Sequence, residues 1–228
     1  MLVPIIIEAL APTEMFNKIF EILKSITFWI SSQPNRYRMR GARIEVICFI
    51  LTRSPNPSIL LGQSPYYEMW MPPQEGVYLK ESFVSALRRC LIHECNLKVP
   101  EESETIGPSF HFRSIRFVGL LPLPDERKGE RPVADDIAGT PLEKVLLKSK
   151  AYWLATILVK DRDSISPTAD GRELIDIKWF TLEEAERIIN ETNHPKKAAL
   201  LVKCLKDSRR DLFGAKTVSQ DQSGEGRS

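Results

Sequence analysis

The sequence has few cysteines, little net charge and, at its start, no apolar run long enough to cross a membrane. Its 228 residues include four cysteines, none of them in a Cys-x-x-Cys pair, so no disulfide framework is indicated. The net charge of +2 favours neither a nucleic-acid coat nor a trap for acidic ligands. Residues 1–10 are apolar but lack the basic start of a secretory signal and are too short to span a bilayer. We therefore expect a cytoplasmic protein with reduced thiols and one substantial core.

One segment, residues 70–97, carries charged side chains at a distinctive spacing. Glu81 is followed eight residues later by Arg89, and Glu94 lies near the end of the same helical pattern. This arrangement resembles the signature of the Nudix hydrolases. That signature has a glycine, five residues, Glu, seven residues, then Arg-Glu-apolar-x-Glu-Glu-x-Gly-apolar. Aligned without a gap, the first glycine falls on Glu75 and the last on Asn96.

The residues that hold the shape of this signature are present. In the family, the positions of Glu81 and Arg89 form a pair that braces a loop against a helix. Asn96 replaces a glycine where the helix must end with positive φ, and Asn tolerates that conformation next best after glycine. Leu91 and Leu97 fill the two apolar positions. The resemblance therefore implies an intact loop–helix–loop.

The residues that hold metal in the family are mostly replaced. Its three metal-binding Glu positions fall on Cys90, His93 and Glu94. Mg²⁺ and Mn²⁺ favour several oxygen ligands, so we expect either ion to bind weakly. Thiolate, imidazole and carboxylate at helical spacing could instead converge on Zn²⁺ or Fe²⁺. Alternatively, Cys90 packs as a small hydrophobe and His93 is an ordinary surface residue.

Two flanking stretches extend the resemblance to residues 43–211. The lead-in with Trp70, Pro73 and Gln74 is similar to that of the RNA pyrophosphohydrolase and diadenosine-polyphosphate hydrolase branch. Residues 175–185 resemble the family's closing strand, tryptophan and capped helix. The implied fold is α+β, a Nudix-like α/β/α sandwich with a mixed β-sheet.

The chain divides into three parts. Residues 1–42 form an N-terminal extension, in which residues 12–30 have the apolar spacing of an amphipathic helix that ends at 31–35 and precedes an arginine cluster. Packing of this helix on the domain or on a second copy is favoured over binding to a membrane surface. Residues 43–213 form the Nudix-like domain, and the polar residues 214–228 are expected to be disordered.

Within the domain, apolar and β-branched runs predict long strands at residues 44–51, 113–121 and 152–159, and a hairpin partner at 58–61. Helices are predicted at 182–190 and 196–211. The polar insertion at 122–148 is too long for a plain turn. It is either a lid near the substrate or a solvated loop.

Candidate site residues follow from the resemblance and from side-chain chemistry. Glu94, Glu81 and Glu173 are the catalytic candidates, Glu173 because related enzymes often place an auxiliary acid in its loop. A solvated loop residue is the alternative for Glu173. Gln74 and Arg89 are ligand-binding candidates carried by the motif. Further residues that could contact phosphates or stack on a base are Tyr66, Tyr67, Arg113 and Arg116.

Three functions remain open from the sequence, and it does not decide whether the chain is an enzyme. The favoured one is a module that binds a nucleotide, another diphosphate-containing ligand or a capped or triphosphorylated RNA end, with hydrolysis weak or lost. The second is an active pyrophosphohydrolase acting on a nucleoside diphosphate-X compound or a dinucleotide polyphosphate. The third is an interaction scaffold with a vestigial pocket and a homodimer made by the N-terminal helix.

Overall fold

The computed structural model describes residues 33–99, 110–125 and 142–213, together with residues 128, 129, 133, 138 and 140. The predicted N-terminal helix at 12–30 and the tail at 214–228 lie outside these residues. The helices are α2 (Gln33–Met39), α3 (Phe83–His93), α4 (Leu182–Asn190) and α5 (Pro195–Phe213), with a short 3-10 turn, η2 (Arg162–Ser164). The strands are β1 (Ala42–Thr52), β2 (Ser58–Ser64), β3 (Met69–Met71), β4 (Gln74–Gly76), β5 (His111–Pro122), β6 (Ser149–Val159) and β7 (Asp176–Thr181).

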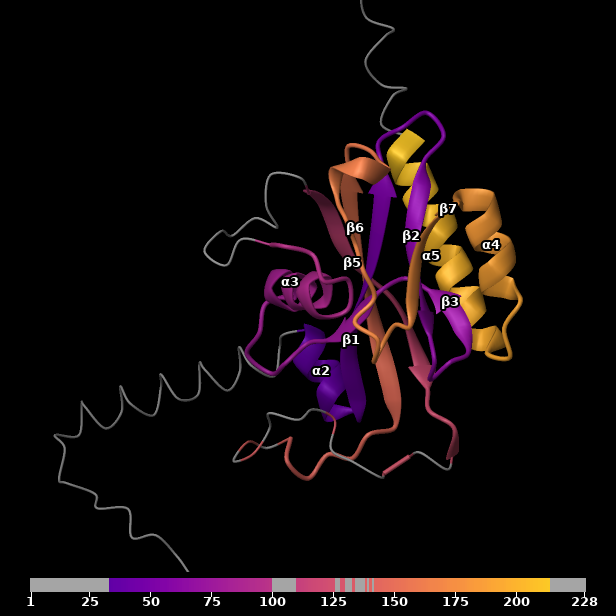
Figure 1. Ribbon diagram of the computed structural model, residues 1–228. Coiled ribbons are helices and arrows are strands. Elements are labelled where there is room, and N and C mark those ends of the chain that lie inside the picture. Colours follow the sequence, from indigo (N-terminus) through magenta and orange to yellow (C-terminus); the bar gives the residue numbers. More distant parts are fainter. Residues whose placement is uncertain are drawn as a thin grey trace, which may run out of the picture.

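The seven strands form one mixed sheet. Its main path runs β3-β2-β1-β6-β5, with β4 paired to β1 and β7 paired to β2. The β1–β6 pair is parallel over its full length, whereas the other pairs are antiparallel. Helices α2 and α3 cover one face of the sheet, and α4 and α5 cover the other (Figure 1). The expected α+β sandwich with a mixed sheet is confirmed.

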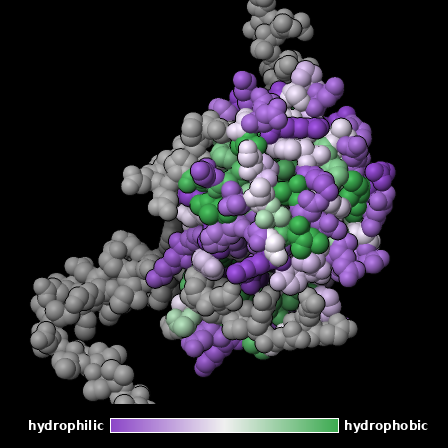
Figure 2. Space-filling view, viewed as in Figure 1, coloured by the Kyte–Doolittle hydropathy of each residue, from purple (hydrophilic) through white to green (hydrophobic). Residues whose placement is uncertain are grey.

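Strand β1 is the centre of the core because both of its faces are buried. Val46, Cys48 and Ile50 pack toward α3, and Ile47 and Phe49 pack toward α4 and α5. A strand covered on both faces has no need for alternating polarity, which explains the dense apolar run in this part of the sequence. Figure 2 shows that hydrophilic residues are interspersed with hydrophobic ones on the face viewed.

The start of the described chain differs from the sequence-based expectation. Residues 33–35 do not end a helix but begin α2. The arginine cluster that follows is not a uniform basic surface, because Arg38 is 2% exposed. Its guanidinium donates to the carbonyls of Val77 and Tyr78 at 2.8 and 3.0 Å. Arg38 therefore fastens α2 to the loop before α3. None of the described helices is both long enough and apolar enough to cross a membrane.

The described part of the 122–148 insertion is anchored rather than wholly solvated. Val133 and Leu142 are fully buried and form a small cluster with Leu79 of the loop before α3. The Gly129 N–H also donates to the Leu147 carbonyl at 2.8 Å. The hydrogen bond closes the insertion on itself, and the contact with Leu79 ties it to the loop that carries Glu81.

Candidate functional site

The loop before α3 is held by an arginine that binds several acceptors at once. Arg89 donates to both carboxylate oxygens of Glu81, at 3.1 and 2.8 Å, and to the Gly76 carbonyl. It also lies 3.1 Å from a carboxylate oxygen of Glu75. Two-point contact between a guanidinium and a carboxylate fixes geometry as well as adding energy. The brace implied by the resemblance is confirmed, and Glu81 is committed to it.

The end of α3 is also as the resemblance implies. Asn96 has φ of 49°, the left-handed conformation that Asn accepts more readily than most residues. The reversal lets the Leu97 N–H donate to the Leu91 carbonyl at 3.0 Å, which closes the helix. The Asn96 amide donates to the Thr168 hydroxyl at 3.0 Å. These contacts fix where the neighbouring Glu94 side chain lies.

Glu94 is a buried carboxylate with one bound and one free oxygen. It is 3% exposed, and its Oε2 accepts the backbone N–H of Gln74 at 3.1 Å. Its Oε1 has no hydrogen-bond partner among the described residues. Burial, reinforced by the nearby carboxylates of Glu173 and Glu75, raises the pKa of Glu94 well above its usual value, despite the bond from Gln74. Glu94 therefore keeps one buried oxygen that no described residue binds.

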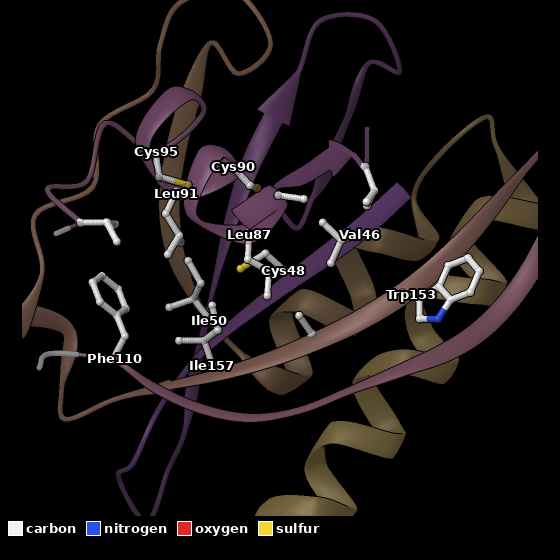
Figure 3. Packing of buried hydrophobic residues seen from close by; sticks show 14 of the residues in the cluster. Val46, Cys48, Ile50, Leu87, Cys90, Leu91, Cys95, Phe110, Trp153 and Ile157 are labelled. Atoms are coloured by element: carbon white, nitrogen blue, oxygen red, sulfur yellow. The ribbon is translucent and has the colours of Figure 1, made fainter. Parts of the chain in front are cut away.

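The other two residues at metal-binding positions do not join Glu94. Cys90 is fully buried, and Figure 3 shows it inside the apolar cluster with Cys48 and Leu87. Its hydrogen bond with Cys48, together with burial, raises the pKa of its thiol well above the usual value. His93 is exposed, because it lies about 100° around the helix from Glu94.

Convergence of Cys90, His93 and Glu94 on one ion was one of two alternatives that the sequence left open. The structure instead has Cys90 in the core and His93 at the surface, which is the other alternative. Helical spacing brings such residues to neighbouring positions, but the core-facing side of α3 is fixed by its packing on β1, and that side includes Cys90. Within the described residues, no group of three His, Cys, Asp or Glu side chains is arranged to hold a metal ion. With Cys90 in the core and His93 at the surface, Glu94 is the one of these three residues that keeps an unbound oxygen at the site.

Glu173 lies in a loop ordered by Asp170, whose carboxylate accepts the backbone N–H groups of Arg172, Glu173 and Leu174. Partial burial, with repulsion from Glu75 and Asp170, raises the pKa of Glu173. Glu173 also contributes to the raised pKa of Glu94. The loop thus brings Glu173 within electrostatic reach of Glu94 and Glu75.

A basic and aromatic cluster adjoins Gln74 on the α5 side of the sheet. Lys197, in the first turn of α5, donates to the Gln74 side-chain oxygen at 3.0 Å and lies 3.7 Å from the centre of the Tyr67 ring. Lys150 on β6 pairs with Glu45 at 2.6 Å and contacts the Tyr67 hydroxyl at 3.3 Å. We refer to these five residues, Glu45, Tyr67, Gln74, Lys150 and Lys197, as the lysine cluster.

Only one of the two lysines in this cluster, Lys150, forms an ion pair with Glu45. Attraction to Lys150 and Lys197 outweighs the effect of burial and lowers the pKa of Glu45. Attraction to Glu45 likewise outweighs burial and raises the pKa of Lys150. Burial, with repulsion from Lys150, lowers the pKa of Lys197 to about 7. Sequence analysis missed Glu45, Lys150 and Lys197, although a glutamate within the apolar β1 was a usable signal, since buried Glu is rarely unpaired.

The remaining ligand candidates are separated. Tyr67 joins the lysine cluster, whereas Tyr66 is 75% exposed. Arg113 and Arg116 lie on the edge strand β5, which β6 and β1 separate from β4 and Gln74. Arg116 approaches Asp207 of α5 at 3.8 Å. The structure therefore places Gln74 between Glu94 and the lysine cluster that includes Tyr67, and it places the two β5 arginines apart from them.

Comparison with known proteins identifies structural neighbours only. No family model matches the chain, and no curated protein matches it. Similar solved structures include a C. elegans Ap4A hydrolase in a binary complex, at 17% identity and TM-score 0.48, covering 76% of this chain and 99% of that one. Another is the NUDIX domain of Shewanella oneidensis NrtR complexed with ADP ribose, at 12% identity and TM-score 0.45, covering 81% and 97%.

A third neighbour is a bifunctional NMN adenylyltransferase/ADP ribose pyrophosphatase from Francisella tularensis, complexed with AMP and a Mn ion. It has 15% identity and a TM-score of 0.45, covering 79% of this chain and 52% of that one. All three TM-scores are below 0.5, and the likeness carries no conclusion about the family or the activity of this chain.

Proposed function

We propose that this chain is a Nudix-like module that binds a nucleotide or another diphosphate-containing ligand, with metal-dependent hydrolysis weak or absent. The observation that carries the proposal is the state of α3. Glu94 is its only carboxylate, and burial raises the pKa of that group well above its usual value. One carboxylate is too few for a hard cation such as Mg²⁺, which favours several oxygen ligands.

The rest of α3 does not compensate for this loss. The Cys90 side chain is buried in the core, and His93 is exposed at the surface. Glu81 is committed to Arg89. The active-hydrolase alternative therefore depends on Glu173 joining Glu94, and their electrostatic proximity is the one observation that favours it.

Features suited to ligand binding are retained beside the same helix. The loop–helix–loop is held by Arg89 and closed at Asn96. Gln74, Tyr67 and the two lysines of the cluster supply an amide, an aromatic ring and positive charge. Such groups recognise phosphates and bases without a metal ion. We infer a cytoplasmic setting, where nucleotides and the ends of capped or triphosphorylated RNA are available as ligands.

The test is a paired binding and turnover screen on the full chain. Diadenosine polyphosphates, ADP-ribose and 5′-triphosphate RNA are each incubated with the protein in Mg²⁺, in Mn²⁺ and in chelator. The proposal predicts a ligand-induced rise in Tm in all three conditions, since a ligand that binds only the folded state stabilises it. It predicts little or no product.

The matched variants are Glu94→Gln and the exposed Glu191→Gln. Turnover that Glu94→Gln abolishes and Glu191→Gln leaves intact would establish the active hydrolase instead. Absence of both turnover and thermal shift with every ligand would favour an interaction scaffold. For that scaffold, the homodimer through the N-terminal helix stays a prediction to be tested by the mass of the full chain in solution.

A further inference from the structure

We propose that Lys197 and Lys150 form an anion site that binds phosphate oxygens of the ligand directly, without a bridging metal ion. The inference rests on the proposed function and names the groups that would carry it out. It starts from the charge count of the lysine cluster. Two lysines face one carboxylate, that of Glu45, which Arg43 also approaches at 3.8 Å, so basic groups outnumber the carboxylate around which they gather.

That positive charge is held away from water. Lys197 is 5% exposed as a residue, and the side chain of Lys150 is 15% exposed. Glu45 lies 2.6 Å from Lys150, and no carboxylate is within ion-pair distance of Lys197 in the described part of the chain. Taking an ammonium out of water is costly unless it is paired. Attraction to Glu45 and Glu94 opposes the effect of burial on Lys197 only in part, so the fold keeps a buried lysine whose charged form is incompletely stabilised.

The partners that Lys197 does have are weak ones for a charged group. An ammonium has three donors, and the described contacts are the neutral oxygen of Gln74 at 3.0 Å and the face of the Tyr67 ring at 3.7 Å. A charged oxygen would bind more strongly than either. Burial and repulsion from Lys150 lower the pKa of Lys197 to about 7, and a bound phosphate would offset both effects.

The position of the cluster ties it to the signature helix. Gln74 contacts Glu94 through its backbone N–H and Lys197 through its side chain. An anion at Lys197 would therefore be linked to the end of α3 through one residue, Gln74. A lysine in this place supplies positive charge directly. Metal-binding carboxylates would otherwise supply it by holding a metal ion, and two of the three are replaced in this chain.

The experiment uses inorganic pyrophosphate as the probe, titrated into the full chain by calorimetry in the presence of EDTA. Four proteins are compared: wild type, Lys197→Met, Lys150→Gln and the exposed neighbour control Lys196→Met. Removing either lysine of the cluster takes away one basic group that a phosphate oxygen could contact. We expect wild type and Lys196→Met to bind equally, and each cluster variant to bind at least about tenfold more weakly, as loss of one charged hydrogen-bonding partner implies.

A purely structural role for Lys197 predicts that Lys197→Met has a lower Tm than wild type. The anion site predicts the opposite: methionine removes the buried charge and keeps the length of the side chain, so the Tm should equal or exceed that of wild type. Unchanged pyrophosphate affinity in both cluster variants overturns the anion site. Because Lys150 is partly exposed, Lys150→Gln keeps the test open if Lys197→Met does not fold.

The outcomes separate this inference from the proposed function. If nucleotides bind wild type and both cluster variants equally, the anion site is overturned and the nucleotide-binding function stands. If wild type binds nucleotides but not pyrophosphate, the anion site is likewise overturned and the nucleotide-binding function stands. If wild type binds neither nucleotides nor pyrophosphate, both proposals fail.

Discussion

Gln74 hydrogen-bonds to Glu94 from one face of the sheet and to Lys197 from the other. Its backbone N–H donates to Glu94 Oε2 at 3.1 Å, and its side-chain oxygen accepts from Lys197 at 3.0 Å. Strand β4, only three residues long, places both contacts beside β1. Gln74 therefore hydrogen-bonds to two buried groups. One is a carboxylate that lacks the other metal ligands of the signature, and the other is a lysine without a carboxylate at ion-pair distance among the described residues.

The brace at Arg89 is expected to be a principal source of stability in the signature loop. Arg89→Met would leave the partly buried carboxylates of Glu81 and Glu75 unpaired. Breaking such a pair should lower the free energy of unfolding by about 3 kcal/mol. Urea denaturation measures the change. The exposed Lys80→Met in the same loop serves as control, and should stay within about 0.5 kcal/mol of wild type.

The two replaced metal positions should respond differently when glutamate is introduced. Cys90→Glu would place a carboxylate in a fully buried site among apolar neighbours, at a cost of about 4 kcal/mol or loss of folding. His93→Glu, on the exposed side of α3, should be nearly neutral. Both are read by thermal and urea unfolding. Equal tolerance of the two would mean that α3 is rotated from the orientation described.

Glu94 should make stability fall as pH rises. Its folded pKa lies well above the usual 4.5, so the folded state binds more protons than the unfolded state between these two values. The contribution of Glu94 is fully present below about pH 4.5 and is lost as pH rises through the folded pKa. Glu94→Gln lacks this titration, so its Tm should rise relative to wild type over that window. A constant difference between the two from pH 4 to 8 would contradict the assignment.

Lys197 should act in the opposite direction. Its pKa is about 7 in the folded state against 10.5 ordinarily, so the unfolded state binds more protons between these values. The stability of wild type relative to Lys197→Met should therefore increase from pH 7 to pH 10, by a few kcal/mol in total. Denaturant titrations at each pH measure it. Lys196→Met should show no such slope against wild type.

Much of the fold and part of the site could be predicted from the sequence. The apolar, β-branched composition of β1 and β6 predicts that both are buried strands. The spacing of Glu81, Arg89 and Asn96, through the resemblance it carries, predicts the pair that holds the loop and the end of the helix. These are local signals, because each depends on residues close together along the chain or on strand composition.

What could not be predicted depends on packing between distant segments. Spacing along a helix does not say which side faces the sheet, so the burial of Cys90 and exposure of His93 were open. The contact between Lys197 and Gln74 joins residues 123 positions apart, and no sequence pattern indicates it. The strand β4 is also too short to give a periodic signal.

The most direct test of the central claim is a single sample of the full chain, titrated with ADP-ribose and with a diadenosine polyphosphate by calorimetry and then assayed for product by chromatography. The account predicts saturable binding that persists in EDTA, with no more than trace product in Mg²⁺ or Mn²⁺. Rapid product formation in Mg²⁺ that Glu94→Gln eliminates would contradict it.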